Sequence, residues 1–232
     1  VGGADAALFT VDPQTGEIRF IDPPDFENPL DQGGDNFYDV VVRATSTATT
    51  SDSENVRIDF ETDADGTPLS AGDGGTLVLD GVTITAIRAQ DSDGNFDDAM
   101  IFDAANPTGG DSDLTQVSHG NVLIISEDGD SSDPDDNGRG GTVVATFDAP
   151  STVRAIALLD TEDAGSTIDL YDAGGDLIRS FDVPAIPDGE AQFLWLEDTP
   201  GVATMRINLV GSAAIDDIKF VRPGEAKFVG QS

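Results

Sequence analysis

"TLVLDGVTITAIRA", residues 76–89, decides the fold class of this chain. Apolar residues flank Asp80-Gly81, and beyond that pair they alternate with Thr. An Asp-Gly pair between two hydrophobic runs is a strong local signal for a β-hairpin, because a two-residue turn needs residues that tolerate positive φ. The stretch therefore predicts two antiparallel strands joined by a tight turn at residues 80–81.

Further strands are predicted before and after this hairpin. "STIDLYDAGGDLIRSFDV" (166–183) is a second hairpin that turns at residues 173–175. The other apolar runs are "VRIDF" (56–60), "AMIFDA" (99–104), "NVLIIS" (121–126), "GTVVATFDA" (141–149), "VRAIALLD" (153–160), "AQFLWLED" (191–198), "ATMRINLV" (203–210) and "AIDDIKFVR" (214–222). No stretch shows helical periodicity. About ten strands with polar turns predict an all-β, jelly-roll-like sandwich over residues 56–222.

The chain is strongly acidic. It has 232 residues with 45 Asp and Glu against 11 Lys and Arg, a formal net charge of −34. This charge excludes nucleic acid and anionic membranes as partners, and no apolar run approaches the roughly 18 residues of a membrane span. Hard oxygen donors, no Cys and a single His favour Ca²⁺ and an extracellular bacterial surface, although a salt-adapted solvated surface fits the same composition.

Residues 1–55 form a different first part. "LFTVDPQTGEI" predicts short strands near residues 9–11 and 17–21 with a turn at "PQTG", and "FYDVVVRA" (37–44) predicts a half-buried strand. The Ser- and Thr-rich residues 46–53 predict a loop or linker, and residues 223–232 a tail. "VRIDFETDADGTP" (56–68) is either the last strand of this part or the first strand of the sandwich.

This first part resembles the second half of a cadherin-like (Ig-like) repeat of bacterial adhesins. The family pattern "F-x-I-D-x-x-T-G-x-I", "D-x-E", "Y-x-V-x-V-x-A" is matched by "LFTVDPQTGEI", "DFE" and "YDVVVRA". The family's acidic "D-x-E" ligates calcium between repeats, which implies calcium ligands at Asp25 and Glu27. The Asp that usually follows the last strand is missing, because Thr45 and Ser46 occupy that region. The first half of the repeat is absent from this sequence, so we expect a longer parent chain.

Clustered carboxylates supply the candidate metal ligands of the second part. The loop "GNVLIISEDGDSSDPDDN" (120–137) and the stretch "DAANPTGGDSDL" (103–114) border neighbouring apolar strands, so both are expected at one end of the sandwich. Two like charges about 4 Å apart cost roughly 4 kcal/mol at an effective dielectric of about 20, which cations would offset. A solvated loop is the alternative to a metal site. The candidate ligands are Asp111, Asp113, Asp128, Asp130, Asp133, Asp135, Asp136 and Asn137.

Two other acidic stretches are weaker candidates. Glu61 and Asp63 begin an EF-hand-like run, but its twelfth position is Gly72 rather than Glu. In calcium-bearing jelly-roll modules, which the chain resembles here, a Glu near the first strand and an Asp in the last strand clasp one ion. That resemblance implies Glu61 with Asp217, and with Asp216 beside it. The run Asp91, Asp93 and Asn95 fits either a metal loop or an ordinary polar turn.

Three runs carry a second resemblance. "AMIFDAANPTGGDSDL" (99–114), "GNVLIISEDGDSSDPDDN" (120–137) and "AIDDIKF" (214–220) resemble a calcium-associated β-sandwich module found near the tips of RTX-type adhesins. This implies a monomeric module of a longer chain that holds several Ca²⁺ ions and captures a glycan or peptide on the surface of another cell. From the residues themselves, we expect one ion, held by the 111–113 and 128–137 loops, to keep an open coordination position for the ligand. The implied ligand-binding residues are Asp111, Asp113, Asp133, Asp135 and Asn137.

Two other functions are compatible with the same sequence. A spacer domain that calcium only rigidifies is the main alternative, and a glycosidase with paired carboxylates is a weaker one. The sequence contains no nucleophile elbow, zinc-protease motif or P-loop, so we predict no enzymatic activity. Trp195 shares one strand face with Phe193, and core packing is preferred over a sugar-binding platform. We expect His119, alone in a polar loop, to take no part in catalysis.

Overall fold

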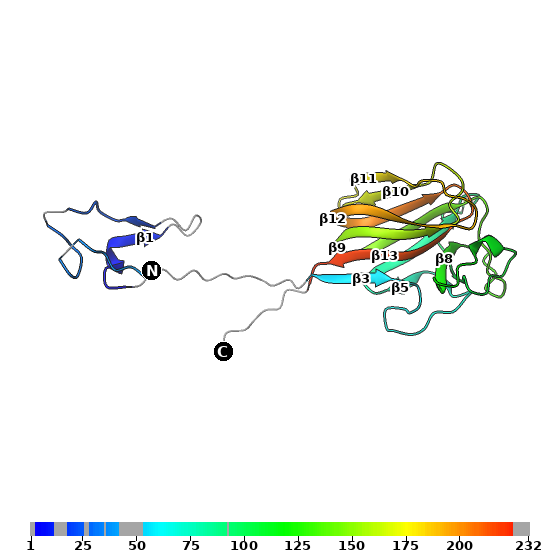
Figure 1. The fold of residues 1–232 in the computed structure, drawn as a ribbon, viewed down its shortest axis with the longest axis horizontal. Helices are drawn as coiled ribbons and strands as arrows, with labels where there is room; N and C mark the ends of the chain where they lie inside the picture. Colours follow the sequence, from blue (N-terminus) through cyan, green and yellow to red (C-terminus); the bar gives the residue numbers. More distant parts are fainter. Residues whose placement is uncertain are drawn as a thin grey trace. The chain divides into compact units, whose positions relative to one another are not determined.

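The computed structural model describes residues 3–11, 18–25, 28–34, 36–41, 53–91 and 93–224 (Figure 1). The chain divides into two compact units, Val1–Thr49 and Thr50–Ser232, where the sequence analysis places the boundary at residues 55 and 56. Within the described residues, no helix has the length and apolar character needed to span a membrane. Each unit is described by itself.

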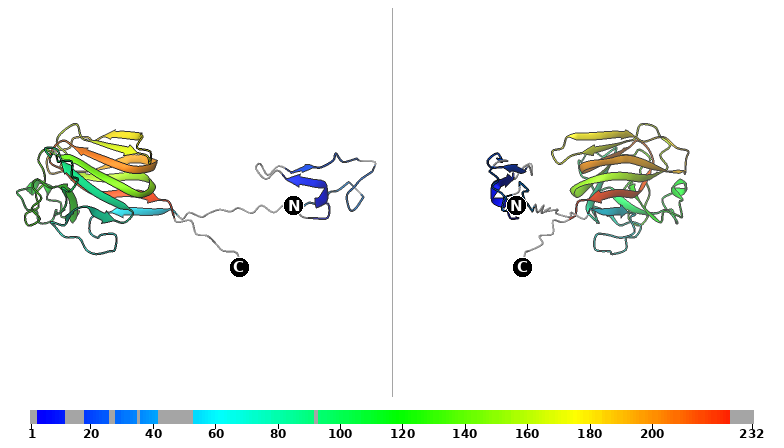
Figure 2. Two further views of the ribbon diagram at one scale, coloured as in Figure 1. Left: turned by 180° about the vertical axis from the view of Figure 1, so that it is seen from behind. Right: turned by 60° about the vertical axis from the view of Figure 1, so that its left-hand side comes forward.

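The second unit is a sandwich of antiparallel strands, which confirms the predicted all-β class (Figure 2). Helical structure in its described residues is limited to one short 3-10 turn, η2 (Ser112–Leu114). The predicted hairpin is formed by β5 and β6, with Gly81 at a φ of 76°. The strands are β3 (Glu54–Ile58), β4 (Gly74–Gly75), β5 (Leu77–Leu79), β6 (Val82–Arg88), β7 (Ala99–Asp103), β8 (Asn121–Ile125), β9 (Gly141–Leu159), β10 (Thr167–Tyr171), β11 (Leu177–Asp182), β12 (Ala191–Leu209) and β13 (Ala214–Arg222).

Two long strands, β9 and β12, connect the layers. The sequence analysis predicts four strands here, but residues 141–159 and 191–209 each form one continuous strand. Pro150 lies within β9 and Pro200 within β12, where the pairing between these strands shifts register. Proline cannot donate to a strand ladder, so it is tolerated where the ladder is already interrupted. In both long strands the proline therefore marks a bend between the layers and does not end the strand.

The strand pairing defines the two layers. In the first layer, β6 pairs with the first half of β9, and β10 joins the second half of β12 to β11. In the second layer, the second half of β9 pairs with β13, which pairs with both β3 and β8. β3 and β13 are therefore neighbours, with Ile58 opposite Ile218 and Glu54 opposite Arg222.

Both long strands begin and end at the same end of the sandwich. Gly141 pairs with Leu209, and Leu159 pairs with Ala191. Ser212, which follows β12, contacts the carboxylates of both Asp136 and Asp160, which lie just before and just after β9. This end, which we name the acidic end, therefore collects the loops around residues 104–120, 126–140, 160–166 and 184–190.

The core lies between the two layers, because alternate residues of the strands face inward. Phe220 of β13 is 1% exposed and meets the ring of Phe147 edge-on, with centroids 4.9 Å apart. A second apolar cluster packs Leu114 of η2 against Phe102 and Val122. This second cluster anchors the loop that carries Asp111 and Asp113.

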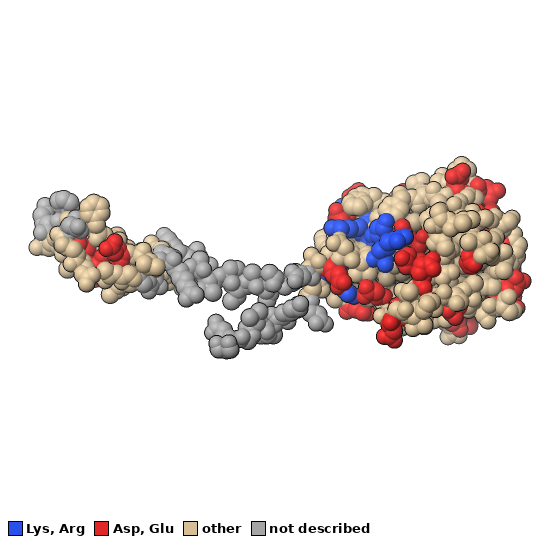
Figure 3. Space-filling model, turned by 60° about the horizontal axis from the view of Figure 1, so that its bottom comes forward, with Lys and Arg blue, Asp and Glu red and all other residues tan. Residues whose placement is uncertain are grey.

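One strand face has the opposite orientation from that predicted. Phe193 and Trp195 share a face of β12, as expected, but both are 54% exposed rather than packed in the core. Their partners across the strand, Ala157 and Ala155, are small and buried, so the aromatic rings lie on the outer surface of the second layer. Figure 3 shows Lys and Arg gathered in one area of this unit, among acidic side chains.

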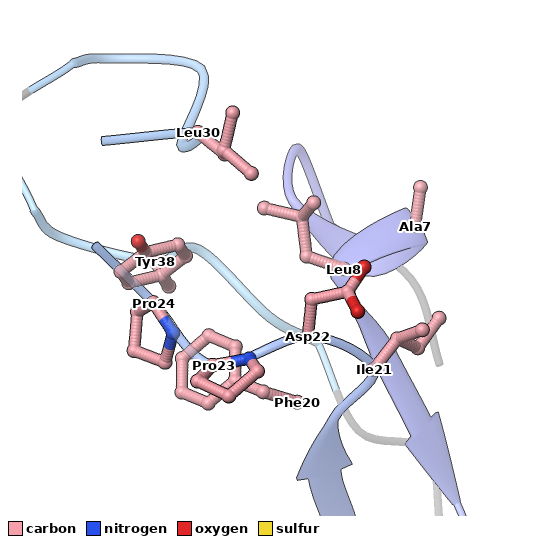
Figure 4. Close-up of a pocket in the computed structure, with 9 residues that line it drawn as sticks. All are labelled: Ala7, Leu8, Phe20, Ile21, Asp22, Pro23, Pro24, Leu30 and Tyr38. Carbon is pink, nitrogen blue, oxygen red and sulfur yellow. The ribbon is translucent and has the colours of Figure 1, made fainter. Parts of the chain in front are cut away.

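The first unit contains η1 (Ala6–Leu8) and a hairpin of β1 (Phe9–Val11) and β2 (Ile18–Phe20). These strands confirm the prediction, while the "PQTG" turn lies outside the described residues. The rings of Phe9 and Phe20 lie 4.3 Å apart, and Tyr38 meets Phe20 edge-on. A small pocket of about 80 Å³ opens beside Phe20 and Tyr38 (Figure 4).

The predicted strand at residues 37–44 is not formed over residues 37–40, and residues 42–44 lie outside the described part. The Asp5 side chain accepts a hydrogen bond from the Asp39 amide at 2.7 Å, and the Asp5 amide donates to the Asp39 carbonyl at 3.1 Å. A carboxylate thus takes the place of a strand partner. The predicted alternation persists, because Tyr38 is half-buried while Phe37 is 78% exposed.

Candidate functional site

The two acidic loops meet at the acidic end, as the sequence analysis expects. Thr108 donates from its hydroxyl to the carbonyl of Pro134 at 2.7 Å, and the Gly109 amide donates to Asp133 Oδ1 at 3.0 Å. Gly109 has a φ of 67°, and a Cβ built there would lie 2.0 Å from the Cβ of Asp135. The close approach of the loops therefore depends on glycine at this position.

Several of the predicted carboxylates organise their own loop. Asp128 Oδ1 accepts from the Asp130 amide at 2.8 Å, and Asp130 Oδ1 accepts from the Ser132 amide at 2.9 Å. These are side-chain turns of the kind that Asp favours in loops. The Ser132 hydroxyl also donates to Asp130 Oδ1 at 2.7 Å, and this bond, followed by the amide bond, lowers the pKa of Asp130. Both carboxylates are exposed and belong to the outer part of the loop.

Asp136 is the buried member of this loop. It is 7% exposed, its Oδ2 accepts from the Ala213 amide at 3.0 Å, and its own amide donates to Asp111 Oδ2 at 2.8 Å. Burial raises the pKa of Asp136 to about 7, and Asp111 adds to the shift. Burial, followed by the charge of Glu127, raises the pKa of Asp135 to about 6. At neutral pH these two carboxyl groups are therefore at least partly ionised, in surroundings that destabilise the charged form.

Three further carboxylates converge beside this pair. Oxygens of Asp113, Asp160 and Asp188 all lie within 4.8 Å of one another. Asp113 comes from η2, Asp160 follows β9, and Asp188 lies in the loop before β12. Three segments distant in sequence thus bring negative charge to one point, which is the arrangement that a hard cation stabilises.

Asp160 is the fixed member of this group. Its side chain is fully buried, Oδ1 accepts from the Gly189 amide at 2.7 Å, and Oδ2 accepts from the Ser212 hydroxyl at 3.0 Å. Burial raises the pKa of Asp160, these hydrogen bonds oppose the shift, and Asp113 and Asp188 add to it. Asp113 and Asp188 are exposed, so the group is open to solvent on one side.

Sequence reasoning identifies Asp113 but misses Asp160 and Asp188. The signal for Asp160 is a single carboxylate at the end of the apolar run "AIALLD" (155–160), which looks like an ordinary strand end. Asp188 lies in "PDGE" (187–190), a typical turn sequence. Only the return of β9 to the acidic end brings these residues to Asp113.

Glu61 and Asp217, which the resemblance places around one calcium ion, contact different groups in the structure. Glu61 Oε1 accepts from the Asn121 amide at 2.9 Å, whereas Asp217 pairs with Arg57 and with Lys219 Nζ at 3.4 Å. The strands themselves are adjacent, as expected, but each carboxylate is engaged by a different group. A calcium role for Glu61 with Asp217 stays a prediction.

The other predicted residues lie in local contacts. Asp216 is buried and bonds His119 Nδ1 at 2.6 Å, and Asp63 Oδ1 accepts from the Thr67 amide at 2.8 Å. Asn137 is buried and exchanges two hydrogen bonds with the Gln90 amide, at 2.9 and 3.0 Å. In the first unit, Asp25 accepts from Asn28 at 3.3 Å, and Glu27 lies outside the described residues.

The raised pKa of Asp136 gives a pH dependence. In EGTA, we expect thermal stability to increase as the pH falls from 8 towards 5. The folded-state pKa of about 7 exceeds the ordinary value of 3.8, so the folded state binds this proton more tightly. The resulting stabilisation is present below the unfolded pKa and is lost as the pH rises through about 7. Melting curves at each pH test it, and Asp136→Asn should flatten the trend; equal slopes in both chains would contradict the assignment.

Comparison with known proteins gives only distant structural similarities. No known protein family and no curated protein matches the sequence. Among solved structures, a family 29 carbohydrate-binding module from Piromyces equi is 11% identical, with a TM-score of 0.35 over 74% of this chain and 92% of the module. A fucose-binding module from Streptococcus pneumoniae is 12% identical, with a TM-score of 0.34 over 58% of this chain and 89% of that module.

An F5/8 type C domain from Bacteroides fragilis is 11% identical, with a TM-score of 0.33 over 66% of this chain and 99% of that domain. TM-scores of this size establish neither a common fold nor a common function, and we therefore infer function from the residues of the chain itself. The cadherin-like and RTX-type resemblances gain no support from these comparisons and stay predictions.

Proposed function

We propose that residues 50–232 form a calcium-dependent ligand-binding module, with the ion held by Asp113, Asp160 and Asp188. The convergence of these three carboxylates within 4.8 Å is the observation that carries the proposal. Carboxylate oxygens are the ligands that Ca²⁺ prefers, and each oxygen of Asp160 keeps a lone pair beside the hydrogen bond that it accepts. Asp111 and Asp136 lie close enough to be linked to this group through Ser212.

The exposed side of the group gives the binding function. Ca²⁺ takes six to eight oxygen ligands, more than three aspartates supply, and Asp113 and Asp188 both face solvent. Two neighbouring hydroxyls of a sugar, together with water, would complete the coordination from that side. We therefore propose a surface glycan of another cell as the ligand and binding rather than catalysis as the activity.

The setting follows from composition and from the resemblances stated above. A cysteine-free chain with a net charge of −34 suits a calcium-rich exterior, where ions offset the repulsion. We propose that the chain is a monomeric part of an extracellular bacterial adhesin. A peptide ligand, or a spacer function without a ligand, is a different outcome of the tests below.

Calcium titration by calorimetry tests the ion site. Asp160→Asn and Asp188→Asn should each weaken Ca²⁺ binding by at least about tenfold, since even residues outside the first coordination shell cost that much. Asp148→Asn is the matched control, because Asp148 is an exposed acid on β9, away from the group. Unchanged affinity in both cluster variants would overturn the site.

Glycan and peptide arrays, each probed with Ca²⁺ and with EGTA, test the ligand. Calcium-dependent capture of glycans, lost in Asp188→Asn, is the expected result. Calcium binding without any calcium-dependent capture would assign the ion a purely structural role. The buried position of Asp160 favours this spacer alternative, because an ion held by a buried carboxylate would also fix the three loops that meet there.

A further inference from the structure

A row of four residues crosses the outer surface of the second layer. Trp195 of β12 pairs with Ala155 of β9, Ala155 pairs with Lys219 of β13, and Lys219 pairs with Arg57 of β3. Residues that pair directly across neighbouring strands project from the same face of the sheet. An aromatic ring, a methyl group, an ammonium and a guanidinium therefore stand side by side on one surface.

The row forms a groove because its second member is small. Ala155 lies between Trp195 and Lys219 in this row, and all three residues help to line a hollow with a volume of about 340 Å³. Phe193, 54% exposed, extends the aromatic wall, and the ammonium of Lys219 lies 4.4 Å from its ring centroid. The two aromatic rings on one edge thus face cations on the other.

A β-bulge adds a third cation. Lys219 and Phe220 are consecutive on β13, yet they pair with Ala155 and Val153, so Arg154 is the extra residue on β9. Its Nη1 donates to Asn55 Oδ1 at 2.6 Å, which holds the guanidinium beside the groove. Bulges re-aim side chains in this way near functional sites.

The charge of the groove is opposite to that of the chain. Its lining contains Arg57, Arg154 and Lys219 and no carboxylate, in a protein with 11 basic and 45 acidic residues. Each of these cations has an acidic partner outside the lining: Arg57 pairs with Asp217 and, at 3.5 Å, with Asp59; Lys219 pairs with Asp217 at 3.4 Å, and Arg154 with Asp198 at 3.0 Å. These pairs hold the cations in position and leave part of their donor capacity for a ligand.

The chemistry of the lining defines the ligand. Guanidinium and ammonium groups only donate hydrogen bonds, and the single amide acceptor, Asn55, is already used by Arg154. Trp195 also lines the groove, and its indole N–H adds one more donor. The groove therefore suits a ligand that is rich in acceptors and has an apolar face for the indole.

We propose that this groove binds an acidic oligosaccharide built from hexuronic acids. The apolar face of one pyranose ring stacks on Trp195, and a sugar carboxylate accepts hydrogen bonds from Arg57, Arg154 or Lys219. A planar guanidinium matches a carboxylate in two-point contact. An acidic peptide offers carboxylates without the rigid ring that fits the aromatic wall, which makes a sugar the better match.

This groove is distinct from the calcium group. None of its lining residues is a carboxylate, so the binding does not require the ion. The net charge of −34 repels an acidic ligand at long range, but in 150 mM salt such repulsion is screened beyond about 8 Å. Contacts within the groove therefore decide the affinity at physiological ionic strength.

Calorimetry in EGTA with trigalacturonic acid tests the proposal independently of the calcium site. Wild-type chain should bind this trisaccharide and should bind its carboxyl-reduced, neutral counterpart at least about tenfold more weakly. Trp195→Ala should weaken binding about tenfold or more, as loss of an aromatic anchor does, and Trp195→Phe should restore part of it. Ala155→Leu, which fills the groove, should abolish binding with the aromatic and basic residues intact.

The control is Arg206→Gln, which removes one exposed cation from another part of β12. It should leave binding unchanged. Arg57→Gln should weaken binding of the acidic trisaccharide more than binding of the neutral one. Equal affinity for both trisaccharides, no binding by the wild-type chain, or tighter binding of tri-glutamate than of trigalacturonic acid would overturn the proposal. Circular dichroism establishes that each variant is folded.

Discussion

Removing calcium from the 232-residue chain should lower the melting temperature of its second unit by about 10 °C. An ion present at about 1,000 times its dissociation constant stabilises the folded state by about 4 kcal/mol, and in a domain of this size each kcal/mol corresponds to about 2–4 °C. Without the ion, Asp113, Asp160 and Asp188 repel one another across less than 4.8 Å. Differential scanning calorimetry with CaCl₂ and with EGTA measures the shift.

The variants sharpen this result. Asp160→Asn removes the buried ligand, so the difference between its melting temperatures in CaCl₂ and in EGTA should be clearly smaller than that of the wild-type chain; a tenfold weaker affinity alone removes about a third of the stabilisation. Asp148→Asn should keep the full wild-type difference, since it removes a charge elsewhere. If the wild-type chain melts at one temperature under both conditions, the proposed ion site is wrong. A shift of equal size in Asp160→Asn would place the stabilising ion at other carboxylates.

Truncating Phe220 should cost about 3–5 kcal/mol of the free energy of unfolding, the usual penalty for removing a buried aromatic ring. Phe220 is 1% exposed, packs edge-on against Phe147, and lies on β13 between β3 and β9. Its loss leaves a cavity at the point where both layers and the last strand meet. Urea denaturation of Phe220→Ala against the wild-type chain measures the difference.

Val78→Ala is the matched control for this truncation. Val78 is an apolar strand residue that is 57% exposed, and surface changes of this kind stay within about 0.5 kcal/mol. A loss of less than about 1 kcal/mol in Phe220→Ala would show that the core does not close around this ring.

Local signals in the sequence were sufficient for much of the fold. Asp80-Gly81 determines a hairpin by turn chemistry alone, and the polar-apolar alternation of "TITAIR" (83–88) continues as a strand with one buried face. Pro150 lies inside β9, where the sequence predicts two separate strands. Proline ends a strand inside a regular ladder but is accepted at a bend, and the sequence does not say which of these applies.

The site was less predictable than the fold. The charge-rich residues 126–137 were recognised because their density is unusual, and they do meet the loop of Asp111. Asp160 and Asp188 have no such density, and their convergence depends on how β9 returns. Trp195 was assigned to the core because alternation reveals which residues share a face and not which face is covered. The small residue beside Trp195, Ala155, is far away in the sequence and becomes its neighbour only through the pairing of β9 with β12.

The pairing of β3 with β13 has a mechanical consequence. Glu54 and Arg222 are opposite each other in that pairing, and an ion pair of 2.6 Å joins their side chains. Tension applied to the polypeptide on both flanks would reach the sandwich at this single point. It would peel two antiparallel strands apart one rung at a time, whereas pulling from opposite ends would shear all rungs together. The sandwich is therefore loaded at one edge only, and the Glu54–Arg222 pair would be the first to separate.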